Sequence, residues 1–453
     1  MIRTLACLAL LVALTAPARA GEGQAKIFPY AYTIDDLPNG LRLITIPTEY
    51  PDLVSLYIVV QAGSRNEVEP GKSGYAHLFE HLMFRGSENF TPAQADDLLK
   101  KAGADSNAYT TDDRTVYHVN FSKEDFDAVL KLKADAFQRL KYDQAAFKTE
   151  TLAVLGEYNK NSANPISKLF ETLRATAFST HTYSHTTMGF IKDIEDFPNQ
   201  YDYSLQFYSR YYRPEYTTVI VVGDITHDQV LSAVKREFGD WKRGDWAPKI
   251  PVEPAQTGPR EATVEWASPT LPYLAIGFRG PGYSDESRDK PALDLLTDIG
   301  FGENSDIYRK LVINEQKVDQ FGVAFSAHVD PELFTVIARV KDPKDIPYVR
   351  TQILETVVRF RKELVSQKVL DATRSRQRYS FALSLDSSSA IAANLAPYIG
   401  LRRSPETLER LFAQYQSITP EDIRSAADRY LIDNNRTVVT LQTKASTGEG
   451  GSK

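Results

Sequence analysis

The sequence predicts an α+β protein made of two related halves, each a mainly antiparallel sheet with helices packed on one face. The main observation is a diverged internal repeat, in which apolar strand-like and helix-like segments recur at nearly constant offsets of 216 to 219 residues. A stretch rich in proline and glycine, residues 244–262, separates the two copies. The matched pairs are 53–67 with 271–286, 76–86 with 292–302, and 218–222 with 437–441.

Composition and charge limit the possible functions. The chain has 453 residues, more than one hydrophobic core usually holds, and a formal net charge of -6. Without the first twenty residues, which contain Arg3 and Arg19 but no acid, the charge becomes -8. Nucleic acid is therefore not an expected partner.

The N-terminal residues 1–20 are typical of a secretory signal peptide. Arg3 precedes an apolar run from 5 to 14, and small residues stand before the cleavage site expected after Ala20. The apolar run is too short to span a bilayer, so no transmembrane segment is expected in the mature chain. The only cysteine, Cys7, lies in this segment, and a disulfide-free exported protein suits a periplasmic location. The polar tail, 444–453, is expected to be disordered.

Hydrophobic periodicity places the elements of the first half, residues 21–243. Alternating or continuous apolar runs predict strands, and runs of period 3.6 predict helices. Their order favours antiparallel strands with helices on one face over a doubly wound sheet. The predicted strands are 41–46, 54–61, 106–111, 115–121 and 217–223, and the predicted helices are 73–84, 93–101, 123–140, 145–160, 166–178, 203–211 and 228–238.

The helix predicted for 73–84 contains the strongest chemical signal. His77 and His81 are four residues apart and Glu80 lies between them, so a helix places all three side chains on one face. The neighbouring residues are apolar, and ionisable groups on a buried helix require a partner. Zinc held by two imidazoles is such a partner, and the carboxylate can accept a proton from water.

The pentad His77-Leu78-Phe79-Glu80-His81 is the inverted zincin motif H-x-x-E-H, so the chain resembles the superfamily of pitrilysin, insulin-degrading enzyme and mitochondrial processing peptidase. In that family a glutamate 76 residues after the second histidine is the third zinc ligand, and another lies seven residues before it. Glu157 and Glu150 stand at these positions, on one face of the predicted helix. The resemblance makes Glu157 a ligand and Glu150 a candidate catalytic residue that orients a ligand or the substrate.

The resemblance also implies an architecture and a substrate. Family members of the processing-peptidase type are two α+β halves that face each other as a clam shell. The segment Asn107-Ala108-Tyr109-Thr110 is similar to the family's N-A-x-T edge strand, on which an extended peptide pairs through its backbone. Asn107 and Ala108 are therefore the expected substrate contacts. The alternative is that residues 106–107 are only a turn before a buried strand.

The second half, 263–443, is expected to lack a metal site. Opposite the pentad it carries Leu293, Leu296 and Thr297, and the helix-like stretch 365–380 has no glutamate. The chain should therefore bind one Zn²⁺. Relatives also have an arginine and, seven residues later, a tyrosine that hold the substrate and stabilise the oxyanion. Here Val312 and Asp319 stand in these places.

We therefore expect a periplasmic zinc metallopeptidase that cleaves short unstructured peptides. A homologous zinc-free subunit would supply the missing arginine and tyrosine, and a homodimer is the alternative assembly. A non-catalytic scaffold subunit of the same superfamily is the second functional class, although such subunits generally have a broken pentad. A zinc hydrolase acting on another substrate is the third. His181 and His185 are either core residues or substrate contacts.

Overall fold

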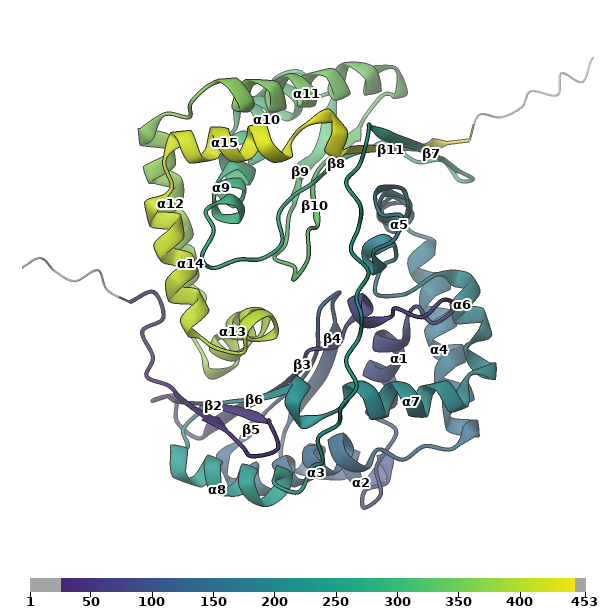
Figure 1. Ribbon diagram of the computed structural model, residues 1–453, viewed down its shortest axis with the longest axis vertical. Coiled ribbons are helices and arrows are strands. Elements are labelled where there is room, and N and C mark those ends of the chain that lie inside the picture. The colour runs from purple at the N-terminus through teal and green to yellow at the C-terminus, as the bar shows by residue number, and fades with distance from the viewer. Residues whose placement is uncertain (1–25, 445–453) are drawn as a thin grey trace, which may run out of the picture.

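The computed structural model describes residues 26–444, so the predicted signal peptide and residues 445–453 of the predicted tail lie outside the described residues. Two sheets, each with its own group of helices, lie one above the other in Figure 1. The connection between the halves runs without regular structure from the end of the first half to the first strand of the second (Figure 1). Within residues 26–444, no helix combines the length and apolar character needed to span a bilayer.

The first sheet has six strands in the order β1-β2-β6-β3-β5-β4. Only β2 and β6 pair in parallel among these neighbours, and β4 forms one edge of the sheet. The strands are β1 (Thr33–Asp36), β2 (Arg42–Pro47), β3 (Leu53–Val60), β4 (Asp105–Thr110), β5 (Thr115–Ser122) and β6 (Thr217–Gly223).

The second sheet repeats this topology in five strands, in the order β7-β11-β8-β10-β9. Its single parallel pair, β7 with β11, occupies the place of β2 with β6. This common order confirms the two related halves predicted from the repeat. The strands are β7 (Arg260–Trp266), β8 (Tyr273–Arg279), β9 (Val318–Ala324), β10 (Leu333–Val340) and β11 (Arg436–Thr443), so β7 begins three residues inside the range predicted as linker.

The helices of the first half agree with the predicted ones within a few residues, and the short α6 was not predicted. They are α1 (Tyr75–Leu82), α2 (Pro92–Lys101), α3 (Phe126–Arg139), α4 (Gln144–Ser162), α5 (Pro165–Ala177), α6 (Ile191–Asp196), α7 (Tyr201–Tyr211) and α8 (His227–Phe238). The second half contains α9 (Asp289–Phe301), α10 (Asp306–Tyr308), a π-helix (Arg309–Asn314), α11 (Ile346–Lys362), α12 (Gln367–Leu383), α13 (Ser388–Arg402), α14 (Glu406–Ser417) and α15 (Pro420–Tyr430).

Each sheet is covered on one face by helices of its own half and on the other face by a helix of the opposite half. In β3, Leu56 and Ile58 belong to the core of the first half, whereas Tyr57 and Val59 pack into the core of the second half. Helix α13 packs on β3 and β6, and α5 packs on β7, β8 and β11. The central strands are therefore buried on both faces, and the two halves interlock (Figure 1).

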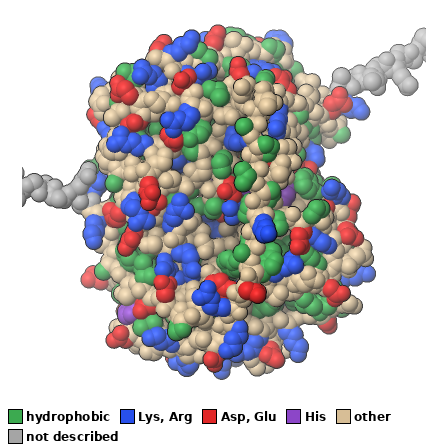
Figure 2. All heavy atoms as spheres, in the orientation of Figure 1, with side chains coloured by type: hydrophobic (Ala, Val, Ile, Leu, Met, Phe, Trp, Pro, Cys, Tyr) green, Lys and Arg blue, Asp and Glu red, His purple; other side chains and the backbone are tan. Residues whose placement is uncertain are grey.

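A buried ionic cluster joins the halves where the loop 326–332 meets the first half. Asp112 lies 2.6 Å from the guanidinium of Arg174 and 2.9 Å from Nε2 of His328. Arg65 donates to Asp330 over 2.5 Å. On the face of the molecule in Figure 2, basic and acidic side chains are interspersed over both halves.

Candidate metal centre

Helix α1 is fixed at its N-terminus by contacts that only a small residue permits. Gly74 has φ of 94°, and a Cβ there would lie 2.6 Å from the carbonyl oxygen of Met188. The carboxylate of Glu67 accepts hydrogen bonds from the backbone N–H groups of Gly74 and Ala76, at 2.6 and 2.7 Å. A carboxylate at this end also complements the helix dipole. The first turn of α1, which carries His77, is therefore held rigidly.

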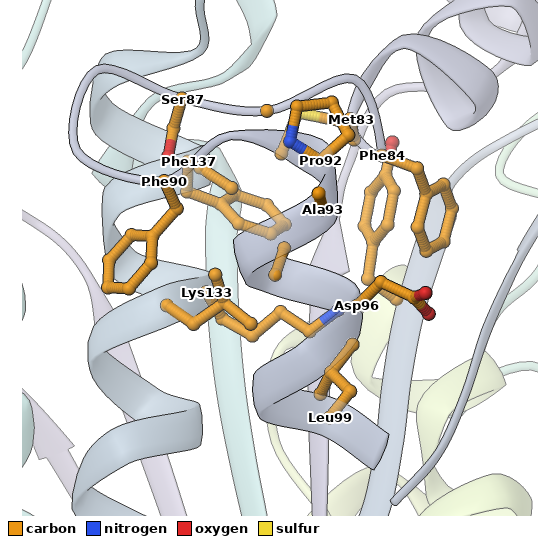
Figure 3. A pocket seen from close by; sticks show the side chains of 15 residues that line it. Met83, Phe84, Ser87, Phe90, Pro92, Ala93, Asp96, Leu99, Lys133 and Phe137 are labelled. Carbon is orange, nitrogen blue, oxygen red and sulfur yellow. The ribbon is translucent and has the colours of Figure 1, made fainter. Parts of the chain in front are cut away.

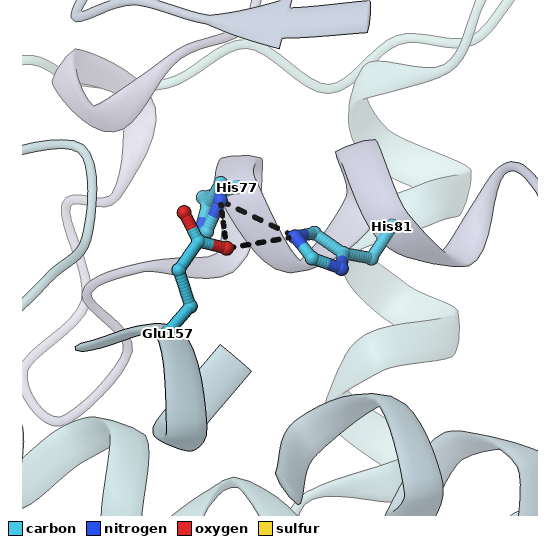
Figure 4. Close-up of side chains that lie close together, drawn as sticks. All are labelled: His77, His81 and Glu157. Atoms are coloured by element: carbon cyan, nitrogen blue, oxygen red, sulfur yellow. Dashed lines mark hydrogen bonds and ion pairs between the residues drawn. The ribbon is translucent and has the colours of Figure 1, made fainter. Parts of the chain in front are cut away.

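His77, His81 and Glu157 converge as the sequence predicted (Figure 4). The Nε2 atoms of His77 and His81 are 3.3 Å apart, and Oε2 of Glu157 lies 3.5 Å from the first and 3.4 Å from the second. Helix α1 supplies both imidazoles and α4 supplies the carboxylate across the helix contact.

This donor set fits a zinc ion. Ligand atoms about 2.1 Å from a tetrahedral zinc lie roughly 3.4 Å from one another, and the three observed separations match that value. Three protein ligands would leave the fourth position open, as in catalytic zinc sites. The site is reachable from solvent, since the side chain of Glu157 is 38% exposed. Among residues 26–444 this is the one group of three or more ligand side chains close enough to hold a metal ion.

The two imidazoles lie in different environments. Burial and the neighbouring His81 lower the pKa of His77 to about 4, which keeps this ring neutral and able to bind a metal. The pKa of His81 is raised, because Glu150 and Glu157 stabilise the charged ring against the effect of burial. Protons would therefore compete with a metal ion mainly at His81.

Glu80 stands beside the ligands and is oriented by β4. The hydroxyl of Thr110 donates a 2.6 Å hydrogen bond to Oε2 of Glu80. Burial raises the pKa of Glu80, although the Thr110 hydrogen bond acts in the opposite direction. A carboxylate whose pKa is shifted toward neutrality is suited to accept and return a proton. Thr110 ends the N-A-x-T segment, but its pairing with Glu80 was not predicted.

Glu150 lies behind His81 and is not one of the three converging ligands. Its Oε2 atom is 3.6 Å from Nδ1 of His81, on the side of the ring opposite Nε2, and its Oε1 atom is 2.5 Å from Arg85. Glu150 is almost fully buried. This position suits a carboxylate that orients a ligand ring. Sequence reasoning missed Arg85, which follows the pentad by four residues.

The segment with Asn107 and Ala108 forms the exposed edge strand β4, paired only with β5 among the described strands. The N–H of Ala108 is directed away from β5 and donates to Oδ1 of its neighbour Asn107, at 2.9 Å. The edge therefore presents backbone groups to which another strand could pair, on the strand that orients Glu80.

The structure buries the other histidine pair instead of exposing it to a substrate. His181 lies 2.9 Å from Asp330 at the junction of the halves, and Nδ1 of His185 lies 3.0 Å from the carbonyl of Thr186. Of the two alternatives for His181 and His185, core residue or substrate contact, the structure therefore favours the core residue. In the second half, Val312 lies in the π-helix, and Asp319 in the edge strand β9 pairs with Arg339.

Comparisons with known proteins agree with this geometry. The family model "Insulinase (Peptidase family M16)" matches residues 42–190, and "Peptidase M16 inactive domain" matches residues 200–377. The zinc protease PqqE of Helicobacter pylori is 30% identical over 416 residues, which cover 90% of this chain and 91% of that protein. The chain belongs to peptidase family M16. The resemblance inferred from the pentad is thereby confirmed.

Other M16 proteins extend the comparison to processing peptidases and to solved structures. A probable mitochondrial-processing peptidase β subunit of Arabidopsis thaliana is 24% identical, over 89% of this chain and 76% of that protein. A crystal structure of a protease from Helicobacter pylori superposes with a TM-score of 0.84 at 29% identity, covering 91% of this chain and 99% of the other. The two-half M16 fold is thus shared along almost the whole described chain.

Proposed function

We propose that this M16 protein is a periplasmic zinc metalloendopeptidase that cleaves short, unstructured peptides. The observation that carries the proposal is the convergence of His77, His81 and Glu157 at 3.3–3.5 Å beside an oriented, partly buried carboxylate, Glu80. The periplasmic location is supported by the leader-like pattern of residues 1–20.

The chain's own residues divide the work of hydrolysis. His77, His81 and Glu157 would hold one Zn²⁺, which supplies a Lewis acid that polarises the scissile carbonyl and lowers the pKa of water. Glu80, oriented by Thr110, takes the proton from the attacking water and delivers it to the leaving amine nitrogen. Glu150 fixes the ring of His81. The β4 edge holds the peptide extended, with Asn107 and Ala108 as its contacts.

Glu80→Gln tests the proposal because the substitution removes the proton acceptor while retaining the shape of the side chain. We expect the variant to bind zinc like the wild type and to lose about 10²- to 10⁴-fold in the cleavage rate of an unstructured peptide. Glu88→Gln, at an exposed glutamate outside the site, is the matched control and should keep full activity. Equal cleavage by Glu80→Gln and the wild type would contradict the proposed role.

A second part of the proposal concerns the missing donors. Val312 and Asp319 offer no positive charge or phenol, and loss of oxyanion donors costs on the order of a hundredfold or more in rate. We infer that a homologous zinc-free subunit supplies an arginine and a tyrosine. Adding the purified product of a neighbouring homologous gene should then raise the cleavage rate of the wild-type chain and leave Glu80→Gln inactive.

The scaffold alternative predicts a different result from the same assay. Zinc content does not distinguish a scaffold subunit from an enzyme. For a scaffold subunit, no combination of chains would show peptide cleavage that depends on Glu80. If the chain alone already cleaved peptides at its maximal rate, the zinc-free partner would be unnecessary and the inferred division of roles would be wrong.

A further inference from the structure

A cavity of about 420 Å³ lies next to the metal-binding helix, between α2, α3 and the residues that follow α1. We call it the Lys133 pocket, and its walls are mainly apolar (Figure 3). The residues that define it here are Met83, Phe84, Phe90, Leu99, Lys133 and Phe137. Helix α2 forms one wall of the cavity, and none of the residues of α2 is fully buried. The side chains of α2 therefore do not fill the cavity.

Lys133 is the unusual member of this lining. Its residue is only 8% exposed, and its ammonium group donates one hydrogen bond, to Oγ of Ser106 at 3.2 Å. No carboxylate among the described residues lies within 4 Å of this ammonium group. Asp96, across the pocket, is exposed and pairs with Lys100 instead. Burial lowers the pKa of Lys133 to about 8, so the group is still mostly charged at neutral pH. A buried cation without a counter-ion is costly, and an anion entering the pocket would relieve that cost.

The pocket lies beside the path of a peptide paired with β4. Ser106, which contacts Lys133, and Thr110, which contacts Glu80, are four residues apart on one face of β4. At about 3.3 Å per residue this separation is roughly 13 Å, so side chains of a paired peptide that point to this face pass both groups. Phe84, at the pocket wall, is 41% exposed and follows Glu80 by about one helical turn.

We propose that the Lys133 pocket receives a glutamate side chain of the substrate, from a residue close to the scissile bond. The inference rests on the proposed peptidase function and specifies its substrate class. A glutamate places its apolar stem against Phe84 and Phe137 and its carboxylate against the ammonium group of Lys133. A charge-assisted hydrogen bond in a mainly apolar pocket is stronger than one to a neutral amide. A lysine or arginine side chain is disfavoured by the like charge.

Peptide binding to a cleavage-deficient protein tests the pocket separately from catalysis. A peptide series that carries Glu, Gln, Leu or Lys at one position on either side of the scissile bond is titrated against Glu80→Gln. The comparison proteins are Glu80→Gln with Lys133→Met, and Glu80→Gln with Lys131→Met. Lys131 is on the same helix but exposed, so it is the matched control.

We expect the glutamate peptide to bind Glu80→Gln at least about tenfold more tightly than the glutamine peptide. Lys133→Met should abolish this ratio while keeping or improving affinity for the leucine peptide, which also shows that the variant is folded. Lys131→Met should leave the ratio unchanged. Equal affinity for the glutamate and glutamine peptides, or a ratio unaffected by Lys133→Met, would overturn the proposal. Failure of the wild type to cleave peptides that it binds with this preference would instead overturn the peptidase function.

Discussion

Glu150 and Glu157 are seven residues apart on α4 but have different roles in the geometry of the site. Oε2 of Glu157 converges with two imidazole nitrogens, whereas Glu150 contacts the far side of the His81 ring and Arg85. We therefore expect Glu157→Gln to abolish most zinc binding. Glu150→Gln should weaken zinc binding only about 10- to 100-fold, which is the usual loss when a carboxylate that orients a ligand histidine is replaced. Competition with a chelator, measured on both variants, separates the two cases, and equal losses would contradict the assignment.

Helix geometry predicted the histidine pair, because a spacing of four in α1 returns to the same face in any α-helix. Glu157 was predicted from the resemblance to the family, since no local spacing shows that α4 packs against α1. Thr110, Arg85 and Lys133 could not be assigned to their partners in this way. Their contacts depend on how α1, α3, α4 and β4 pack together, which no local periodicity specifies.

Strand β4 combines an open edge with a link to Glu80, which makes substrate pairing testable through the peptide backbone. In an antiparallel pair, alternate residues of one strand direct their N–H and C=O groups toward the neighbouring strand. N-methylation at successive positions of a substrate peptide should therefore reduce cleavage strongly at every second position near the scissile bond. Initial rates for the methylated series provide the measurement, with the unmodified peptide as control. An effect that is uniform along the peptide would argue against pairing on β4.

Most strands and helices were predictable from periodicity, but their partners were not. The apolar pattern of α5 shows that one face is buried, yet it does not specify the sheet that buries it. Leu169 and Leu173 of α5 pack against Tyr273 and Leu441 of the other half. Likewise, the continuous burial of β6 indicates cover on both faces without revealing that α13 provides one of them. The shape of the complete core determines which helix packs on which sheet.

The junction between the halves gives the complete molecule a predictable dependence on pH. Burial disfavours the charged form of His328, but Asp112, Glu332 and Asp113 outweigh it and raise the pKa above 6.5. Its contribution to stability is therefore complete below pH 6.5 and is lost as pH rises through the folded-state pKa. The pKa of Asp330 is lowered from 3.8 to about 2, because His181 and Arg65 outweigh burial, so its contribution is lost as pH falls through that range.

We expect the melting temperature to decline as pH rises above 6.5 and His328→Gln to flatten that decline. The physical reason is that glutamine keeps a hydrogen-bonding group but does not titrate. Thermal unfolding between pH 5 and 9 supplies the measurement. His227→Gln is the control, because His227 is partly exposed and lies beside Asp35 rather than in the ionic cluster at the junction. This variant should retain the wild-type pH profile. Identical profiles for His328→Gln and the wild type would show that the junction does not depend on this proton.

Anomalous diffraction at the zinc edge, from crystals of the zinc-loaded protein, would locate the ion that we assign to His77, His81 and Glu157. We expect one strong peak per chain within coordination distance of His77 Nε2, His81 Nε2 and Glu157 Oε2, with no peak in the second half. A zinc-loaded crystal without a peak at these atoms, or with its peak on other residues, would contradict the metal centre and the mechanism built on it.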